Sequence, residues 1–156
     1  MIHHLSLIPN DARCHELSWF WLNDREIREL TMSPIFTRED HNIFFKNLPL
    51  RSDYKIWGIL LDGHEIVGAA GLKNHRDSLA EYWGYIGEKK YWNQGLGRSL
   101  FKVVEEEARN IGIIDLDLKA FTNNIRAIKL YQKVGFLIDH HNSTDSYLRM
   151  FKQGIQ

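Results

Sequence analysis

The sequence predicts an α/β (α+β) fold in which helices flank a mostly antiparallel central sheet. Three successive segments between residues 54 and 87 are rich in β-branched, aromatic and aliphatic residues, and Asp62-Gly63 separates the first two as a tight hairpin turn does. After them, segments with helical and strand-like spacing of apolar residues alternate toward the C-terminus. No linker and no internal repeat divides the sequence, so we expect a single domain over residues 1–156.

The first third of the chain contributes one strand and at least two helices. Residues 4–8 alternate enough to form a short strand, and Asn10 or Asp11 can cap the helix that follows it. Thr37 and Asp40 resemble a capping box, which indicates a further short helix over about residues 38–48.

The remaining elements continue the sheet and add two helices. The three strand-like segments cover 54–61, 65–72 and 79–87, and a long amphipathic helix over about 96–110 follows them. Gly112 stands where a helix C-cap would be. A strand, a helix and two closing strands complete the order, at 113–121, 124–134, 136–140 and 147–151.

Composition narrows the class of partner and the compartment. The chain has 20 Lys and Arg against 20 Asp and Glu, so its formal charge is zero. Proteins that wrap nucleic acid need a surplus of basic residues, so we expect no nucleic-acid partner. The longest apolar runs are far shorter than the roughly 20 residues of a membrane helix, so no membrane partner is expected. The first nine residues do not resemble a secretory signal, which favours the cytoplasm.

The cysteine and histidine pattern predicts neither a disulfide nor a metal site. Cys14 is the only cysteine, which excludes an internal disulfide and a zinc site built on thiolates. The adjacent pairs His3-His4 and His140-His141 point their side chains apart on strands, so neither pair makes a metal site by itself. We therefore expect no metal cofactor.

A loop with two glycines, Gly95 and Gly97, lies between a predicted strand and the long helix. Glycines let the backbone approach a ligand, and the first N–H groups of a helix attract anions, so this loop can hold a pyrophosphate. A loop of this kind can also serve tight packing alone. Arg98 and Leu100 stand where a Walker loop needs Lys and a dinucleotide fingerprint needs its third glycine, so both of those sites are disfavoured.

A second motif follows in residues 124–136 and is more specific. The pattern Asn-x-x-Ala, then Leu-Tyr-x-Lys-x-Gly-Phe, occurs here at fixed spacing from Asn124 to Phe136. Together with the glycine loop it resembles the GNAT superfamily of acyl-CoA-dependent N-acyltransferases, over about residues 56–136. Trp92 stands where many relatives carry Gln or Arg, and Tyr91-Trp92 resembles the RimJ/RimL-like branch of the superfamily.

The resemblance implies acetyl-CoA as the acyl donor and a GNAT-like mixed sheet whose strands splay apart at the cofactor. The strand end at Ile86 and Gly87 would part from the strand at 113–121, leaving N–H groups for the pantetheine arm. The backbone of residues 93–98 would hold the pyrophosphate. The cofactor-binding residues expected from this comparison are Ile86, Gly87, Trp92, Asn93, Gln94, Gly95, Leu96, Gly97, Arg98, Asn124, Ala127 and Tyr131.

Acyl transfer to an amine needs an acid for the leaving thiolate and a base for the ammonium. Tyr131 lies two helical turns after Asn124, on the same helix face, and we expect its phenol to act as the general acid. Otherwise Tyr131 is only a buried aromatic. Glu81 is the expected base, and an apolar setting would raise the pKa of its carboxyl group. The alternative is that Glu81 is a solvated charge at the edge of the sheet. Glu65, on the neighbouring strand, is a weaker candidate for the base.

The acceptor is expected to be the primary amine of a small molecule. Residues 21–24 resemble the start of GNAT enzymes that acetylate amino sugars on nucleotide carriers, including the PseH-like group, so Trp21, Asn23 and Asp24 are the expected acceptor-binding residues. The same residues can instead serve core packing and helix capping. A RimJ/RimL-like acetyltransferase of protein N-termini and a non-catalytic acyl-CoA sensor remain the alternatives, and a homodimer is possible.

Overall fold

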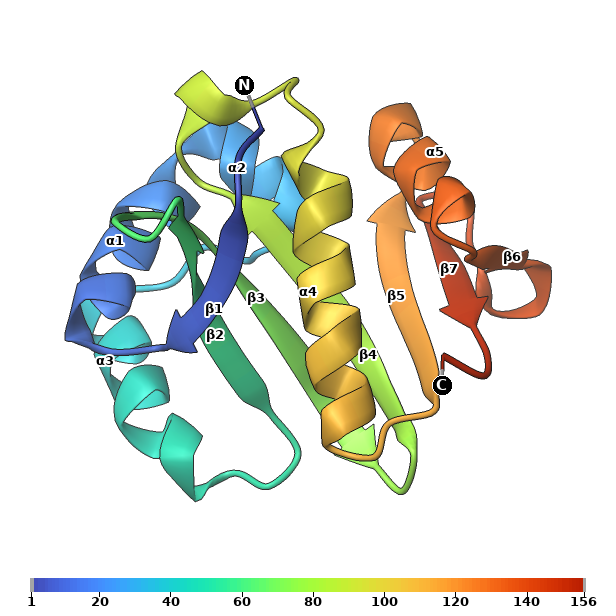
Figure 1. Cartoon of the computed structure of the whole chain (residues 1–156), viewed down its shortest axis with the longest axis horizontal. Helices are drawn as coiled ribbons and strands as arrows, with labels where there is room; N and C mark the ends of the chain where they lie inside the picture. The colour runs from blue at the N-terminus through green and yellow to red at the C-terminus, as the bar shows by residue number, and fades with distance from the viewer. Residues whose placement is uncertain (1, 156) are drawn as a thin grey trace.

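Seven strands form a single sheet in the computed structural model, which describes residues 2–155 (Figure 1). The strands lie in the order β1-β2-β3-β4-β5-β7-β6, and every neighbouring pair is antiparallel except β4 and β5, which run parallel. The mixed, mostly antiparallel sheet is thus confirmed. The strand bounds are β1 Leu5–Pro9, β2 Lys55–Leu61, β3 Glu65–Arg76, β4 Leu79–Ile86, β5 Asp115–Phe121, β6 Leu137–Asp139 and β7 Tyr147–Lys152.

Helices cover both faces of the sheet. The alternation of β4 shows the two faces: Tyr82 packs edge-on against Phe101 of α4 at 5.1 Å between ring centroids, whereas Tyr85 points the other way, toward Trp21 of α1. In Figure 1, α4 and α5 lie in front of the strands, and α1, α2 and α3 lie at the other side. Their bounds are α1 Ala12–Asn23, α2 Arg25–Thr31, α3 Arg38–Asn47, α4 Leu96–Asn110 and α5 Ile125–Lys133.

The helix α4 supplies the largest share of the core on its face of the sheet. Its buried side chains recur at the spacing read from the sequence, because residues three and four apart share one face of a helix. They pack against Ile113, which precedes β5, and against Leu116 of β5 and Met150 of β7, all of which are fully buried. The buried residues of α4 are Leu96, Leu100, Phe101, Val104 and Ala108.

The hairpin and capping signals form as predicted, and the structure extends one strand. Asp62 and Gly63 adopt φ of 52° and 82°, and the N–H of His64 donates to the carbonyl of Leu61 over 3.1 Å, which closes the tight turn. The strand β3 runs on to Arg76, beyond the expected end at residue 72. Asp24 separates α1 from α2 and caps α2.

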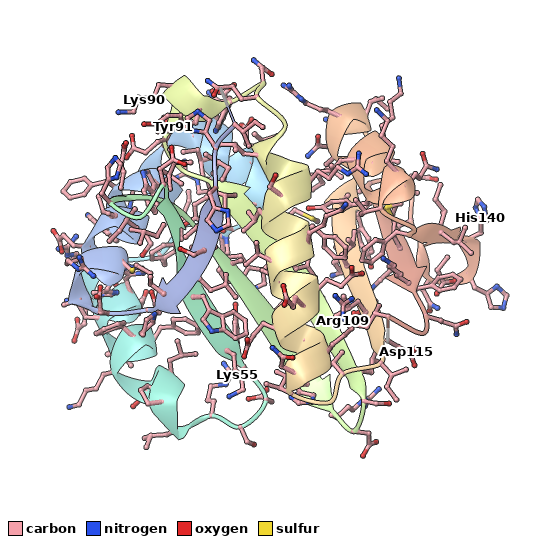
Figure 2. The ribbon with its side chains drawn as sticks, viewed as in Figure 1. Lys55, Lys90, Tyr91, Arg109, Asp115 and His140 are labelled. Atoms are coloured by element: carbon pink, nitrogen blue, oxygen red, sulfur yellow. The ribbon has the colours of Figure 1, made fainter. Side chains whose placement is uncertain are left out.

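The sheet splays between β4 and β5. The two strands pair only at Leu79–Asp115, Ala80–Leu116 and Glu81–Asp117. Beyond this point β4 remains paired with β3 as far as Ile86, while β5 remains paired with β7 as far as Phe121. Figure 2 places Asp115, at the paired end, far from Lys90 and Tyr91, which lead into α4. The opening therefore faces the start of α4, and the expected splay is confirmed.

Candidate active site

The N-terminus of α4 is free of a side-chain cap. Every other α-helix has one: the side chains of Asp11, Asp24, Thr37 and Asn124 accept hydrogen bonds from the first turns of α1, α2, α3 and α5. At α4 the N-cap is Gly95, with φ of 75°, and it offers no acceptor. Within residues 2–155, the first N–H groups of α4 are thus left for an anion, at the positive end of the helix dipole.

The loop before α4 is fixed by side chains that the sequence assigned to the cofactor. The indole N–H of Trp92 donates to the carbonyl of Ile86 over 2.7 Å, and the amide of Gln94 donates to the carbonyl of Lys90 over 3.1 Å. Tyr91 donates to Glu65 from the same segment, over 2.5 Å (Figure 2). Trp92 and Gln94 therefore shape the loop by bonding to its backbone.

Gly95 and Gly97 serve different purposes. A Cβ on Gly95 would meet nothing within 4 Å, so packing does not require glycine here. Glycine is favoured at this position because the backbone adopts a left-handed φ. A Cβ on Gly97 would lie 2.9 Å from Cδ2 of Leu130, on α5. Gly97 therefore allows α5 to pack closely against the first turn of α4, which brings the two helix N-termini to the same opening. Asn93 also adopts a left-handed φ, of 68°, whereas Leu96 and Arg98 are helical.

The parted edge of β4 carries free backbone groups. Main-chain groups on even-numbered residues of this strand face β5, since the carbonyl of Ser78 accepts from Ile114 and Asp115. Gly84 and Ile86 therefore turn their N–H groups toward the opening. The sequence included Gly87 in this set, but its N–H donates to the carbonyl of Val67 over 2.7 Å. That expectation is wrong for Gly87, because the residue faces β3.

The helix α5 presents Tyr131 beside this opening. Asn124 caps the helix by accepting from the N–H of Ala127 over 3.2 Å, which sets its first turn. Tyr131 packs edge-on against Tyr82 and Phe136, with ring centroids 6.1 and 5.8 Å apart. Burial raises the pKa of Tyr131 to about 12. The phenol is therefore protonated at neutral pH and can donate its proton.

A cavity of about 500 Å³ lies between the sheet and the N-terminal helices, and Tyr131 lines it. Its wall includes Trp83 and Tyr85 from β4, Tyr54 from the residue before β2, and Phe36 and His41 from the N-terminal helical layer. The side chains of Tyr54, Trp83, Tyr85 and His41 were not identified as site residues from the sequence. Trp83 and Tyr85 alternate with Gly84 along β4, so their side chains lie on the same face of the sheet. This alternation was the only feature of the sequence that could have placed them together.

His41 is held by the helical layer rather than by a ligand. Its Nε2 lies 3.0 Å from the carbonyl of His15 and 3.1 Å from Oγ of Ser18, whose hydroxyl itself donates to His15. Nε2 therefore carries the proton and donates to both. Burial lowers the pKa of His41, so the ring is neutral.

The three expected acceptor-binding residues serve packing and capping. Trp21 is buried, and its indole N–H donates to Glu88 over 3.2 Å. Asn23 donates to the carbonyl of Trp19 over 2.7 Å. Asp24 caps α2 and pairs with Lys89 at 2.9 Å. None of the three lines the cavity that contains Tyr131.

Glu81 lies apart from Tyr131, in a separate polar pocket next to Asp117. Its carboxylate pairs with Lys73 at 3.3 Å and with Arg149 at 3.1 Å. The apolar setting expected for Glu81 is therefore wrong, because two cations face the buried carboxylate. Glu65, the weaker candidate, is also engaged, by Tyr91 and Lys90.

No helix among residues 2–155 has the length and apolar character needed to cross a bilayer. In the same range, no three or more His, Cys, Asp or Glu side chains come together as metal ligands would.

Comparisons with known proteins agree with the fold and with the sequence motifs. The acetyltransferase (GNAT) family model matches residues 13–136. The acetyltransferase PseH of Campylobacter jejuni is 26% identical over 139 residues, which cover 88% of this chain and 85% of that protein. Its crystal structure with acetyl coenzyme A has a TM-score of 0.74 at 21% identity, covering 96% of this chain and 98% of the other.

A second structural relative is named for its acceptor, spermidine. The spermidine N-acetyltransferase of Vibrio cholerae, solved with CoA and spermine, has a TM-score of 0.87 at 15% identity. The match covers 97% of this chain and 96% of the other. Both structural likenesses show a shared fold.

Proposed function

Because this chain belongs to the GNAT acetyltransferase family, it is an acetyl-CoA-dependent N-acetyltransferase, and we propose that its acceptor is the primary amine of a nucleotide-linked amino sugar. The similarity to PseH supports this acceptor class. The observation that carries the proposed mechanism is the position of Tyr131, a protonated phenol that lines the cavity beside the splayed strands.

The proposed cofactor site follows the uncapped helix and the parted strand. The pyrophosphate would be held by backbone N–H groups of residues 93–98, because the N-terminus of α4 has no competing side-chain cap. The N–H groups of Gly84 and Ile86 would hold the pantetheine arm along the free edge of β4. Asn124 and Ala127 would contribute from the first turn of α5, and Gly87 would contribute by packing alone.

In the proposed mechanism Tyr131 is the general acid. Bound acetyl-CoA supplies the thioester that the acceptor nitrogen attacks. Tyr131 holds a proton at Oη and donates it to the departing thiolate, whose conjugate acid is comparably weak. The proton of the acceptor ammonium leaves through water in the cavity, since Glu81 is engaged by Lys73 and Arg149.

An acceptor panel tests the proposal. Purified protein is incubated with acetyl-CoA and a nucleotide amino sugar, spermidine or a short peptide, while thiol release is followed and the product is identified by mass spectrometry. We expect turnover with the nucleotide amino sugar. Acetylation of the peptide alone would instead identify an acetyltransferase of protein N-termini, and CoA binding with no turnover would indicate a sensor.

The variant Gly97→Glu tests the cofactor site. A carboxylate at this position would add bulk next to Leu130 and negative charge beside the proposed pyrophosphate site. At a hundredfold excess over its Kd, CoA should stabilise the native protein by about 2.7 kcal/mol, measured from thermal unfolding. This stabilisation should be lost in the variant, while Gly97→Ala should retain most of it. Full stabilisation of Gly97→Glu would place the phosphates elsewhere.

A further inference from the structure

The cavity wall contains two polar atoms that the protein leaves without a partner. The indole N–H of Trp83 and the hydroxyl of Tyr85 are buried, and neither has a hydrogen-bond partner among the described residues. Burial raises the pKa of Tyr54 to about 12, and the nearby Trp83 indole offsets only part of that rise, because the two groups do not reach hydrogen-bond geometry. Buried polar groups in native proteins are nearly always satisfied, so these two indicate a missing ligand.

The chemistry of these atoms restricts the ligand. An indole N–H is a donor only, so it must meet an oxygen or another acceptor atom. Burial raises the pKa of the Tyr85 phenol, which keeps this second donor protonated. The two rings stack with centroids 6.1 Å apart and an angle of 17° between their planes, which holds both donors in place. A protonated polyamine offers only N–H donors and cannot satisfy the Trp83 group.

Charge in the cavity favours the same kind of ligand. Lys119 lines the cavity from β5 and forms no ion pair with any described residue; its ammonium lies 4.5 Å from the centroid of the Tyr147 ring. The second lysine, Lys73, is already paired with Glu81. Among residues 2–155, one carboxylate lines the cavity, that of Asp40, which accepts from the N–H of Thr37 in the capping box of α3. The described residues therefore bring no pair of carboxylates to the wall to bind a polycation.

We propose that Trp83, Tyr85 and Lys119 determine acceptor specificity by selecting an amine on an oxygen-rich, anionic molecule and rejecting polycationic amines. This inference rests on the proposed function and makes it more specific, since it assigns the discrimination to three side chains. It also separates this chain from the spermidine N-acetyltransferase that shares its fold.

A graded set of acceptors tests the proposal. The probes are one amino sugar, its 1-phosphate and its nucleoside diphosphate ester, together with spermidine. We expect kcat/KM to rise along the sugar series and to be lowest for spermidine. Lys119→Glu should lower kcat/KM for the diphosphate ester by about tenfold or more, as expected for loss of a hydrogen bond to a charged group. It should leave the free amino sugar much less affected.

Matched variants separate recognition from general damage. Trp83→Phe keeps an aromatic ring and removes the N–H, so it should lower kcat/KM for all three sugar acceptors by about fivefold. Tyr85→Phe should act similarly. Lys102→Glu makes the same charge change as Lys119→Glu on an exposed position of α4, and Trp57→Phe makes the same ring change outside the cavity wall. Both controls should leave the order of acceptors unchanged.

Calorimetric titration of each probe into the CoA-saturated protein provides a readout that does not need turnover. If no amine releases thiol, the proposed function fails, and this titration still tests the inference. The expected result is tighter binding of the diphosphate ester than of spermidine, with the difference removed by Lys119→Glu. Preference for spermidine in the native protein, or binding of the sugar probes that Lys119→Glu and Trp83→Phe leave as tight as in the native protein, would overturn the inference.

Discussion

The indole of Trp21 occupies the space that a side chain on Gly87 would need. A Cβ on Gly87 would lie 2.1 Å from Cδ2 of Trp21. The pair joins α1 to the end of β4, next to the loop that leads into α4. Packing of the first helix therefore fixes the position of the strand end at the proposed cofactor site.

Replacing Gly87 with alanine should destabilise the protein. The added methyl group forces the Trp21 ring to move, and overpacking of this kind costs about 1–3 kcal/mol. Urea unfolding curves of the native protein and of Gly87→Ala give this difference. In a double-mutant cycle the cost should fall when Trp21 is replaced by leucine. An equal cost in both backgrounds would mean that the two residues do not interact in this way.

Tyr131→Phe should lower kcat far more than it weakens CoA binding. General acid catalysis contributes about 10²–10⁴-fold to rate, and the phenylalanine ring preserves the packing against Tyr82 and Phe136. Steady-state kinetics with a saturating acceptor and a separate CoA titration measure the two effects. Unchanged kcat would remove the acid role and leave Tyr131 as a packing residue.

Stability should decrease at alkaline pH. Burial raises the pKa of Tyr131 and of Tyr54 to about 12, whereas phenols in the unfolded chain ionise near pH 10. The folded state therefore binds more protons than the unfolded state between these values. The stabilisation is complete below about pH 10 and is lost as pH rises toward 12.

Urea unfolding at pH 8, 10 and 11.5 measures this decrease. Tyr131→Phe should show a shallower loss of stability across the same range, because one of the buried phenols with a raised pKa is gone. Equal slopes for the variant and the native protein would show that Tyr131 does not contribute to the alkaline transition.

Glu81→Gln should affect stability more than turnover. The carboxylate is buried between Lys73 and Arg149, and breaking a buried ion pair by removing one partner costs about 3–5 kcal/mol. Glutamine keeps the size of the side chain, so the cost should fall at or below the lower end of that range. Because Glu81 lies outside the cavity of Tyr131, kcat at a temperature where the variant is folded should stay within a few-fold of native. A large loss of kcat with an altered pH profile would restore Glu81 as the base.

Local signals in the sequence were sufficient for most of the fold. Asp62-Gly63 specifies a hairpin within four residues, and Thr37 with Asp40 forms the capping box that its spacing predicts. Tyr131 could be predicted as a site residue because its motif, residues 124–136, is one short segment centred on α5. In each case the residues that determine the structure are close together in the sequence.

The parts that sequence reasoning missed depend on distant partners. Glu81 acquires its setting from Arg149, which is 68 residues away. Asp24 was read as a ligand because aspartate both caps helices and binds polar groups, and only the observed break between α1 and α2 shows which applies. Trp83 and Tyr85 become cavity residues because the N-terminal helices cover their face of the sheet, which the pattern of β4 does not specify.

The short pairing of β4 with β5 divides the sheet into two half-sheets of unequal size. The helix α4 connects the two halves through side-chain contacts. Lys152 of the smaller half pairs with Glu105 of α4 at 2.5 Å, and Arg109 of α4 donates to the carbonyl of Ile155 over 2.9 Å. Acetyl-CoA bound in the opening, as proposed, would touch both halves at once. Binding of the donor would then stabilise the contact between the two halves, and the protein with donor bound would resist their separation more strongly than the protein without it.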